Sequence, residues 1–210
     1  FTIGKIKYFV SLIGQFNLYN TLAAISTALL LDINVSDIKR ALLSFPGVPG
    51  RLEKIENKRG IQAYVDFAHT PGALKEVLTT LNTRKKPTEK LIVVFGAASE
   101  RDESKRPIMG KVAGELADQI ILTSEDPRSE DPTHIAKMIL RGVEKAHKKK
   151  FTIETDRTKA IDLAVNTYAQ KGDWVIVCGK GHEESMNLDG FTETPWSDRQ
   201  VLHDVLINQK

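Results

Sequence analysis

Four short segments of this 210-residue chain carry glycine, histidine and charged side chains, and each directly follows an apolar run. The segments are residues 68–71, 96–102, 124–128 and 179–183. Arginine grips a carboxylate or phosphate through paired hydrogen bonds, and small residues allow a ligand to approach the backbone closely. Four such segments together indicate a ligand site more strongly than any one of them.

The segment 124–128 is the most informative about the ligand. Glu125, Asp126 and Arg128 place two carboxylates and one guanidinium within four residues. This set suits an amino acid, whose ammonium attracts acidic groups and whose carboxylate attracts arginine. The alternative is a loop that enters a helix, because Asp131 and Pro132 are typical of a helix start.

Two other segments say less about the kind of ligand that they would bind. Asp66 could accept hydrogen bonds from a ribose, and His69 could contact a phosphate or a base. The alternative is that Asp66 and Thr70 cap the next helix. In residues 96–102, Arg101 could hold an anion, and the alternative is a solvated charged loop.

The segment 179–183 reads Gly-Lys-Gly-His-Glu and is not a P-loop. No Gly-Lys followed by Ser or Thr occurs in the chain, and no Gly-x-Gly-x-x-Gly supports a nicotinamide cofactor. A zinc role for His182 has little support, since the chain has one cysteine and no second histidine at ligand spacing. We therefore predict no metal ligand in this chain.

Apolar runs alternate with amphipathic stretches after residue 49, which predicts an α/β domain. Strands are expected at residues 61–67, 91–95, 119–123, 151–154 and 174–178. Helices are expected at residues 72–81, 106–116, 132–146, 157–169 and 197–208. Right-handed crossovers make a mostly parallel, doubly wound, Rossmann-like sheet the natural arrangement. The four segments then lie beyond the carboxyl ends of the strands, where such sheets bind ligands.

The first 48 residues have a different pattern. Helical spacing predicts a helix over residues 17–31, and Ser36 with Asp37 predicts the cap of a second helix over residues 37–44. Two prolines and two glycines in residues 45–50 indicate a linker. We therefore expect two domains, residues 1–48 and 49–210.

Composition excludes several classes of protein. The contents of 41% hydrophobic and 27% charged residues are typical of a soluble globular protein, and the net charge of +3 is dispersed, without the basic face that nucleic-acid binding needs. No run approaches a membrane span. The single cysteine, Cys178, lies in an apolar run, which predicts a buried thiol and a reducing cytoplasm. A chain that begins with Phe1 is expected to be a piece of a longer protein.

The segments in their order resemble the C-terminal portion of the Mur ligase family, specifically the members that add the third amino acid to a cell-wall precursor. The residues that carry the resemblance are 49–53, 65–71, 94–96, 101–102, 105–107, 125–128, 156–157 and 179–183. Residues 14–24 resemble the end of the family's central, ATPase domain. The resemblance covers nearly the whole chain.

The resemblance implies an ATP-dependent ligase of peptidoglycan synthesis, with ATP and Mg²⁺ as cofactors. Its substrates would be UDP-N-acetylmuramoyl-L-alanyl-D-glutamate and a diamino acid such as diaminopimelate or lysine. ATP phosphorylates the peptide carboxylate in this family, and the amine of the amino acid attacks the acyl phosphate. The family's P-loop and Mg²⁺ ligands lie in upstream domains, so this chain alone is expected to be inactive.

The resemblance also implies roles for residues, without assigning a catalytic base. Residues on the nucleotide side would be Asn17, Asn20, Arg51, Asp66 and His69. The pocket for the incoming amino acid would comprise Arg101, Glu125, Asp126, Pro127, Arg128, Gly179 and Glu183. In that pocket the two arginines would hold carboxylates, and Glu183 would receive an ammonium.

This sequence departs from the family pattern in the specificity loop. Members that use diaminopimelate carry Asp-Asn-Pro-Arg where this chain has Glu-Asp-Pro-Arg. Arg128 is kept, which favours a second carboxylate on the substrate. Asp126 in place of the amide would add negative charge and favour a more cationic amino acid such as lysine or ornithine. A glycine-rich segment of the family is also replaced here by residues 98–102. Two alternatives remain: a related folylpolyglutamate or cyanophycin synthetase, or a binding module without catalysis.

Overall fold

The computed structural model describes residues 1–208. They form two compact units that divide between Val48 and Pro49, and no helix among them is long and apolar enough to cross a membrane. The larger unit is built on a six-stranded sheet of order β3-β4-β8-β5-β6-β7, in which only the β3–β4 pair is antiparallel. The strands are β3 (Glu53–Ile55), β4 (Gln62–Asp66), β5 (Leu91–Phe95), β6 (Gln119–Leu122), β7 (Phe151–Ile153) and β8 (Trp174–Cys178).

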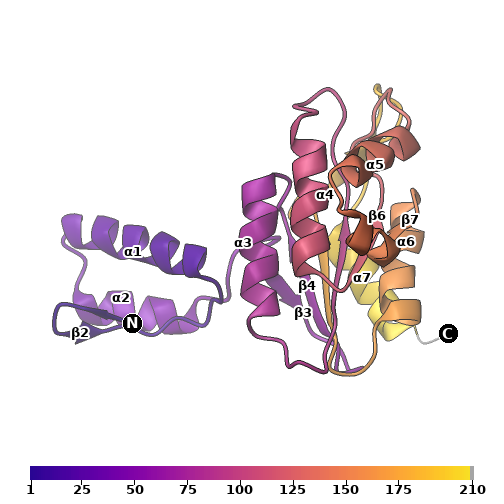
Figure 1. The fold of residues 1–210 in the computed structure, drawn as a ribbon. Coiled ribbons are helices and arrows are strands. Elements are labelled where there is room, and N and C mark those ends of the chain that lie inside the picture. Colours follow the sequence, from indigo (N-terminus) through magenta and orange to yellow (C-terminus); the bar gives the residue numbers. More distant parts are fainter. Residues whose placement is uncertain (209–210) are drawn as a thin grey trace. The chain divides into compact units, whose positions relative to one another are not determined.

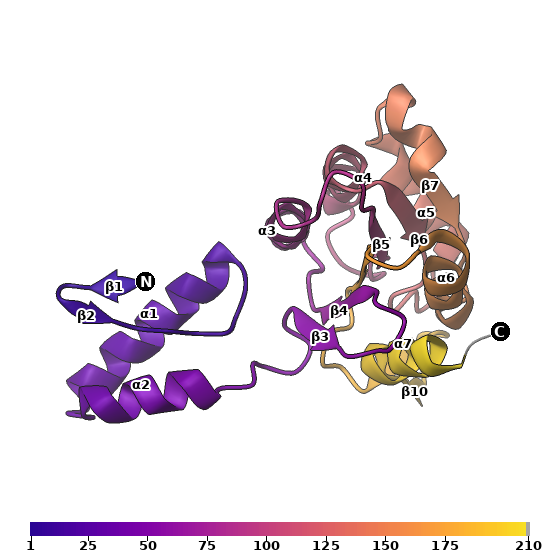
Figure 2. The same ribbon diagram turned by 90° about the horizontal axis from the view of Figure 1, so that it is seen from below.

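Helices cover both faces of this sheet (Figures 1 and 2). Figure 2 shows α3 and α4 on one side and α6 and α7 on the other. The helices are α3 (Pro71–Asn82), α4 (Lys105–Leu116), α5 (Pro132–Arg141), α6 (Arg157–Leu163) and α7 (Asp198–Ile207). Strands β5 and β8 are apolar and almost wholly buried, as expected of parallel strands covered on both faces. The predicted mostly parallel α/β fold is confirmed.

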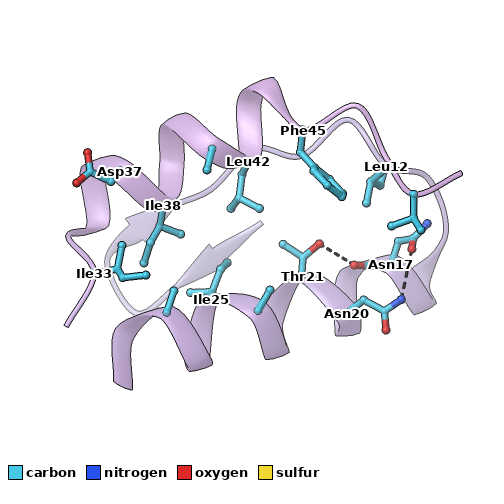
Figure 3. Close-up of a pocket in the computed structure, with 14 residues that line it drawn as sticks. Leu12, Asn17, Asn20, Thr21, Ile25, Ile33, Asp37, Ile38, Leu42 and Phe45 are labelled. Atoms are coloured by element: carbon cyan, nitrogen blue, oxygen red, sulfur yellow. Dashed lines mark hydrogen bonds between the residues drawn. The ribbon is translucent and has the colours of Figure 1, made fainter. Parts of the chain in front are cut away.

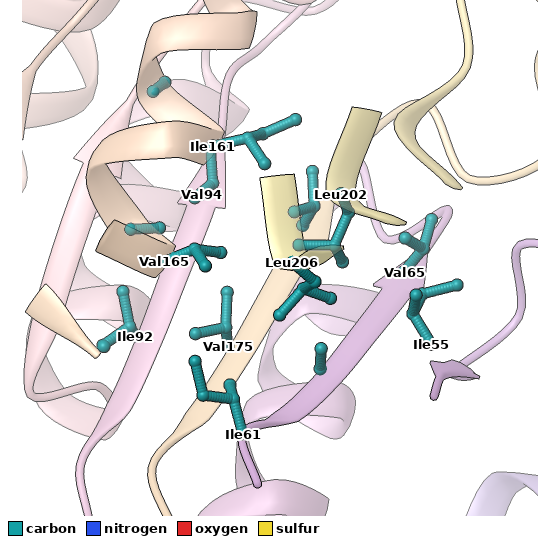
Figure 4. Packing of buried hydrophobic residues seen from close by; sticks show 14 of the residues in the cluster. Ile55, Ile61, Val65, Ile92, Val94, Ile161, Val165, Val175, Leu202 and Leu206 are labelled. Carbon is teal, nitrogen blue, oxygen red and sulfur yellow. The ribbon is translucent and has the colours of Figure 1, made fainter. Parts of the chain in front are cut away.

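One hydrophobic cluster fastens α6 and α7 to the sheet (Figure 4). Alternate residues of β4, β5 and β8 point to the same face and meet the helices, because side chains alternate along a strand. The labelled members include Val65, Val94, Val175, Ile161 and Leu202. This packing anchors both helices to the sheet whose carboxyl ends carry the loops.

The smaller unit contains α1 (Gln15–Leu30), α2 (Val35–Ser44) and a hairpin of β1 (Thr2–Ile3) and β2 (Ile6–Lys7). Tyr8, Ile25 and Ile38 are its buried centre. Both predicted helices are present, but α2 begins earlier than expected. Asn34 rather than Ser36 or Asp37 caps it, because the Asn34 side chain accepts a hydrogen bond from the Ser36 amide at 2.9 Å.

Two predicted helices end earlier than their patterns indicate. The helix expected over residues 132–146 ends at Arg141, followed by a separate 3₁₀ turn over Lys145–Lys150. A side chain at Gly142 would place a Cβ 1.8 Å from the Pro107 carbonyl, so the chain passes α4 at a distance that only glycine allows. The helix expected over residues 157–169 changes at Ala164 to a π turn that ends at Tyr168.

Other bounds differ by one or two residues, and short strands were not predicted. Besides β1, β2 and β3, these are the hairpin strands β9 (Ser185–Asn187) and β10 (Glu193–Pro195). Each of these strands has only two or three residues and no run of apolar alternation, so periodicity gives no signal for it.

Candidate functional site

The four predicted segments meet at one edge of the sheet. They follow β4, β8, β5 and β6, which are adjacent and parallel, so their carboxyl ends point the same way. A cavity of about 460 Å³ lies among these loops. Its lining residues are Phe67, His69, Thr70, Ala98, Arg101, Asp102, Lys105, Glu125, Asp126, Arg128 and Glu183.

Three cationic side chains line the cavity. Arg128 is held from both ends, because its amide donates to the Asn187 carbonyl at 3.2 Å and its Nη1 to the Ser99 carbonyl at 2.6 Å. Arg101 is exposed and forms no hydrogen bond or ion pair with residues 1–208. Lys105 is nearly buried and donates to the His69 carbonyl at 2.9 Å. Arg101 is therefore free to bind a carboxylate, and Arg128 is pre-positioned.

Glu125 provides a buried carboxylate in the same cavity. It is 6% exposed, and its Oε2 has no hydrogen-bond partner within the described residues. Burial raises the pKa of this carboxyl, and the nearby cations Arg157 and Lys105 oppose that effect. Gly179 makes room for it, since a Cβ there would lie 2.9 Å from Oε2. An ammonium from a ligand would satisfy the unpartnered oxygen.

Asp126 and Glu183 share one buried cation. Lys180 donates to Asp126 Oδ1 and to Glu183 Oε2, each at 2.8 Å. The Asn187 amide also donates to Asp126 Oδ1 at 3.0 Å. The predicted negative charge of Asp126 therefore lies against a cation, which Asp126 shares with Glu183.

The buried side chain of Arg157 connects two of the loops through hydrogen bonds to their carbonyls. It is fully buried with Asp198, and its Nη1 and Nη2 also donate to the Ser124 and Cys178 carbonyls at 2.9 and 2.8 Å. These carbonyls lie just after β6 and at the end of β8. The pair therefore fixes the loops that carry Glu125 and Gly179.

Arg106 also joins two of the loops. Its guanidinium holds both oxygens of Glu130 at 2.7 Å and reaches the Ala98 carbonyl at 3.3 Å. The same contact holds the pKa of the Glu130 carboxyl below its usual value. The loops after β5 and β6 are thereby joined.

A cluster of rings and cations forms next to the cavity. Arg51 stacks over the Phe67 ring at 4.6 Å, and His69 and His182 lie 4.5 and 5.1 Å from that ring, centroid to centroid. Arg51 and His69, two of the predicted nucleotide-side residues, are thus brought together around Phe67.

Asp66 has a different environment from that expected. Its carboxylate accepts hydrogen bonds from the Leu52 and Ala68 amides at 2.6 and 2.7 Å, and the residue is buried. Desolvation raises its pKa while these two bonds lower it. Asp66 therefore organises the loops that present Arg51 and His69, whereas Thr70 caps α3 as the alternative interpretation held.

Asn17 and Asn20 belong to the smaller unit. Asn17 donates to the Ile13 carbonyl at 2.8 Å, and Asn20 donates to Asn17 Oδ1 at 3.4 Å. Figure 3 shows both at one end of a largely apolar pocket of about 500 Å³ between α1 and α2.

Several residues of the site were not singled out from the sequence. Lys180 stood inside a quoted motif without a role. Lys105 was considered only as one of the basic groups that could hold an anion, and Asp102 only as part of a quoted motif. Phe67 looked like the end of a strand. Within residues 1–208 no group of three or more histidine, cysteine or acidic residues is placed to hold a metal ion. Cys178 is fully buried, and burial raises the pKa of its thiol.

Comparison with known proteins identifies the family. Residues 50–181 match the family "Mur ligase, glutamate ligase domain". The chain is 42% identical over 210 residues to the UDP-N-acetylmuramoyl-L-alanyl-D-glutamate--2,6-diaminopimelate ligase of Prochlorococcus marinus, covering 97% of this chain and 37% of that protein. It is 44% identical over 200 residues to the ligase of the same name from Aquifex aeolicus, covering 95% and 40%. The chain thus spans about two fifths of the length of these relatives.

Solved structures agree with this result. A structure of a UDP-N-acetylmuramoyl-L-alanyl-D-glutamate--2,6-diaminopimelate ligase superposes with a TM-score of 0.70 at 33% identity, covering 97% of this chain and 40% of the other. A folylpolyglutamate synthase of Mycobacterium tuberculosis superposes with a TM-score of 0.64 at 19% identity, covering 81% of this chain and 39% of the other, which shows a shared fold alone. The chain therefore belongs to the Mur ligase family.

Proposed function

We propose that this chain is the amino-acid-binding C-terminal part of an ATP-dependent ligase of peptidoglycan synthesis. The ligase would add a diamino acid of the diaminopimelate type to UDP-N-acetylmuramoyl-L-alanyl-D-glutamate. Residues 1–48 would be the C-terminal end of its central ATPase domain, and residues 49–210 its C-terminal domain. The relatives named above support this substrate pair, as they are ligases for 2,6-diaminopimelate.

The observation that carries the proposal is the cavity at the carboxyl edge of the sheet. It combines Arg101 and Arg128, which suit carboxylates, with Glu125 and Glu183, which suit ammonium groups. A diamino acid with two carboxylates presents both kinds of group. Pro127 and Gly179 would shape the loops around it.

The reaction has two steps. ATP transfers its γ-phosphoryl group to the peptide carboxylate, which gives an acyl phosphate and ADP. The free amine of the amino acid then attacks the acyl carbon, phosphate leaves, and the new amide nitrogen loses a proton. The residues of this chain would hold the amino acid so that its amine reaches the acyl carbon, which is catalysis by positioning.

The nucleotide would contact this chain through Arg51 and His69. Their placement around Phe67 suits a wall that meets an anion or a base, and Asp66 would keep that wall in shape. Asn17 and Asn20 of the smaller unit stay predicted nucleotide-side residues. Because the sequence has no P-loop, we propose that Mg²⁺ and most of the phosphate contacts come from another part of a longer polypeptide, in the cytoplasm.

The test is phosphate release by the full-length gene product. ATP and UDP-N-acetylmuramoyl-L-alanyl-D-glutamate are supplied with meso-diaminopimelate, lysine, ornithine or glutamate in turn. We expect release that depends on diaminopimelate. A folded protein that releases phosphate with none of these amino acids would refute the proposal.

A further inference from the structure

Lys180 occupies an unusual place for a lysine. Its side chain is 2% exposed, yet its ammonium lies between two carboxylates of the cavity wall, those of Asp126 and Glu183. Those two partners are 18% and 40% exposed, so they lie between the lysine and the ligand space. Lys180 therefore acts on a ligand only through the two carboxylates.

The formal charges of the cavity depend on this lysine. Three cations line it, Arg101, Lys105 and Arg128, against the four carboxylates of Asp102, Glu125, Asp126 and Glu183. Lys180 provides the fourth cation from behind the wall. The site with Lys180 is balanced, which suits a zwitterion with two carboxylates and two ammonium groups. Without Lys180 it would carry one excess negative charge, which suits a cationic amino acid such as lysine.

The ion pair of Asp126 and Lys180 joins two loops of the site. Asp126 follows β6, and Lys180 follows β8. The Asn187 amide fixes the same Asp126 oxygen that Lys180 contacts. The carboxylate is thus held in one position by a cation and a backbone donor, as the oxygen of a neutral amide would be.

We infer that Lys180 is a specificity-determining positioning residue, which neutralises Asp126 so that the cavity selects a dicarboxylic diamino acid over lysine. This inference rests on the proposed function of the same site. It explains how a chain with Glu-Asp-Pro-Arg in its specificity loop can accept the substrate named for its diaminopimelate-ligase relatives.

A double-mutant cycle in the full-length enzyme tests it. The variants are Lys180→Met, Asp126→Asn and the two combined. Asp126→Asn is nearly isosteric and keeps an acceptor for the Asn187 amide. The readout is the ratio of kcat/KM for meso-diaminopimelate to that for lysine, with lysine measured as a competitive inhibitor where it does not turn over. Lys111→Met serves as the control, because Lys111 forms an exposed pair with Glu115 on α4.

The expected kcat/KM ratios follow from the net charge of the cavity in each variant. Lys180→Met lowers the ratio by about tenfold or more, because an unpaired Asp126 repels the second carboxylate and attracts a cation. Asp126→Asn leaves an excess positive charge and weakens lysine binding by about threefold or more. The double variant returns to within about threefold of the wild-type ratio, and Lys111→Met does not change it.

Three results would overturn the inference in an enzyme whose wild type is active. These are a ratio unchanged in Lys180→Met, a double variant no better than Lys180→Met, and equal losses for both amino acids. Where Lys180→Met does not fold, unchanged lysine binding in Asp126→Asn overturns it instead. A wild type that shows no release with any amino acid refutes the proposed function itself.

Discussion

Among the single residues of the cavity, Arg128 is the most directly testable. Its Nη1 donates to the Ser99 carbonyl, and its backbone adopts a positive φ of 48°. We predict that Arg128→Ala raises the KM for diaminopimelate far more than the KM for ATP, because a desolvated charge pair typically contributes about 2–5 kcal/mol. Steady-state kinetics on the full-length enzyme measure both constants. Equal increases in the two constants would contradict the assignment of Arg128 to the amino-acid pocket.

Glu125 gives a prediction about pH. Burial raises the pKa of its carboxyl above the ordinary value of 4.5 in the folded chain. The folded state thus holds this proton more tightly than the unfolded state, so this contribution to stability is present below pH 4.5 and is lost as pH rises through the folded pKa.

We therefore predict that Glu125→Gln becomes more stable relative to wild type as pH rises over that window. Urea unfolding followed by tryptophan fluorescence measures the difference, since Trp174 and Trp196 are the only tryptophans and both lie in the larger unit. A difference that does not vary with pH would show that the carboxyl titrates normally.

Residue types could be predicted from the sequence better than their partners. Arg101, Glu125 and Arg128 were named from charged segments after apolar strands and from the family resemblance, and all three line the cavity. The pairing of Asp126 with Lys180 was not found, because it joins residues 54 positions apart. Asp66 was given a ligand role, but two backbone amides from its own loops occupy it. Such contacts depend on the third dimension and leave no local pattern.

At the scale of elements, the loops are held by buried ion pairs under the cavity. Arg157 and Asp198 are both fully buried. We predict that Arg157→Met lowers the free energy of unfolding by about 3–5 kcal/mol, because it leaves Asp198 buried without its charge partner. The matched control is Arg199→Met, which removes the more exposed pair with Glu53 and should cost at most about 1 kcal/mol. Urea unfolding measures both variants, and equal costs would contradict the account.

Two glycines form a second matched pair. A Cβ at Gly142 would lie 1.8 Å from the Pro107 carbonyl, whereas a Cβ at Gly72, in the first turn of α3, meets nothing within 4 Å. We predict that Gly142→Ala destabilises the larger unit by about 1–3 kcal/mol, through overpacking of α5 on α4. Gly72→Ala should stabilise it by about 0.4–1 kcal/mol. Thermal unfolding ranks the two, and the opposite order would show that α4 and α5 do not approach so closely.

The bounds of strands with long apolar runs were predicted well. The bounds of elements that depend on contacts with distant parts of the chain were not. Strands β5 and β8 have the predicted bounds because five consecutive apolar residues leave little choice. The end of α5 was placed five residues too late, because the amphipathic sequence pattern continues past Gly142 although the helix ends at Arg141. The antiparallel strand β3 was missed, since its three residues pair with β4 without an apolar pattern of their own.

At the scale of the whole molecule, the chain consists of two units that serve different parts of one proposed reaction. The larger unit carries the cavity, and the smaller unit carries Asn17 and Asn20 in a largely apolar pocket. The sequence indicated both units through the proline- and glycine-rich segment at residues 45–50.

We propose that the cavity between the loops after β4, β5, β6 and β8 binds the incoming amino acid. A crystal structure of the full-length protein with ADP and meso-diaminopimelate tests it most directly. We predict that one carboxylate of the amino acid lies within hydrogen-bond distance of Arg128 and that an ammonium group contacts Glu125 or Glu183. An amino acid bound elsewhere, with this cavity filled only by solvent, would contradict the assignment of this cavity to the amino acid.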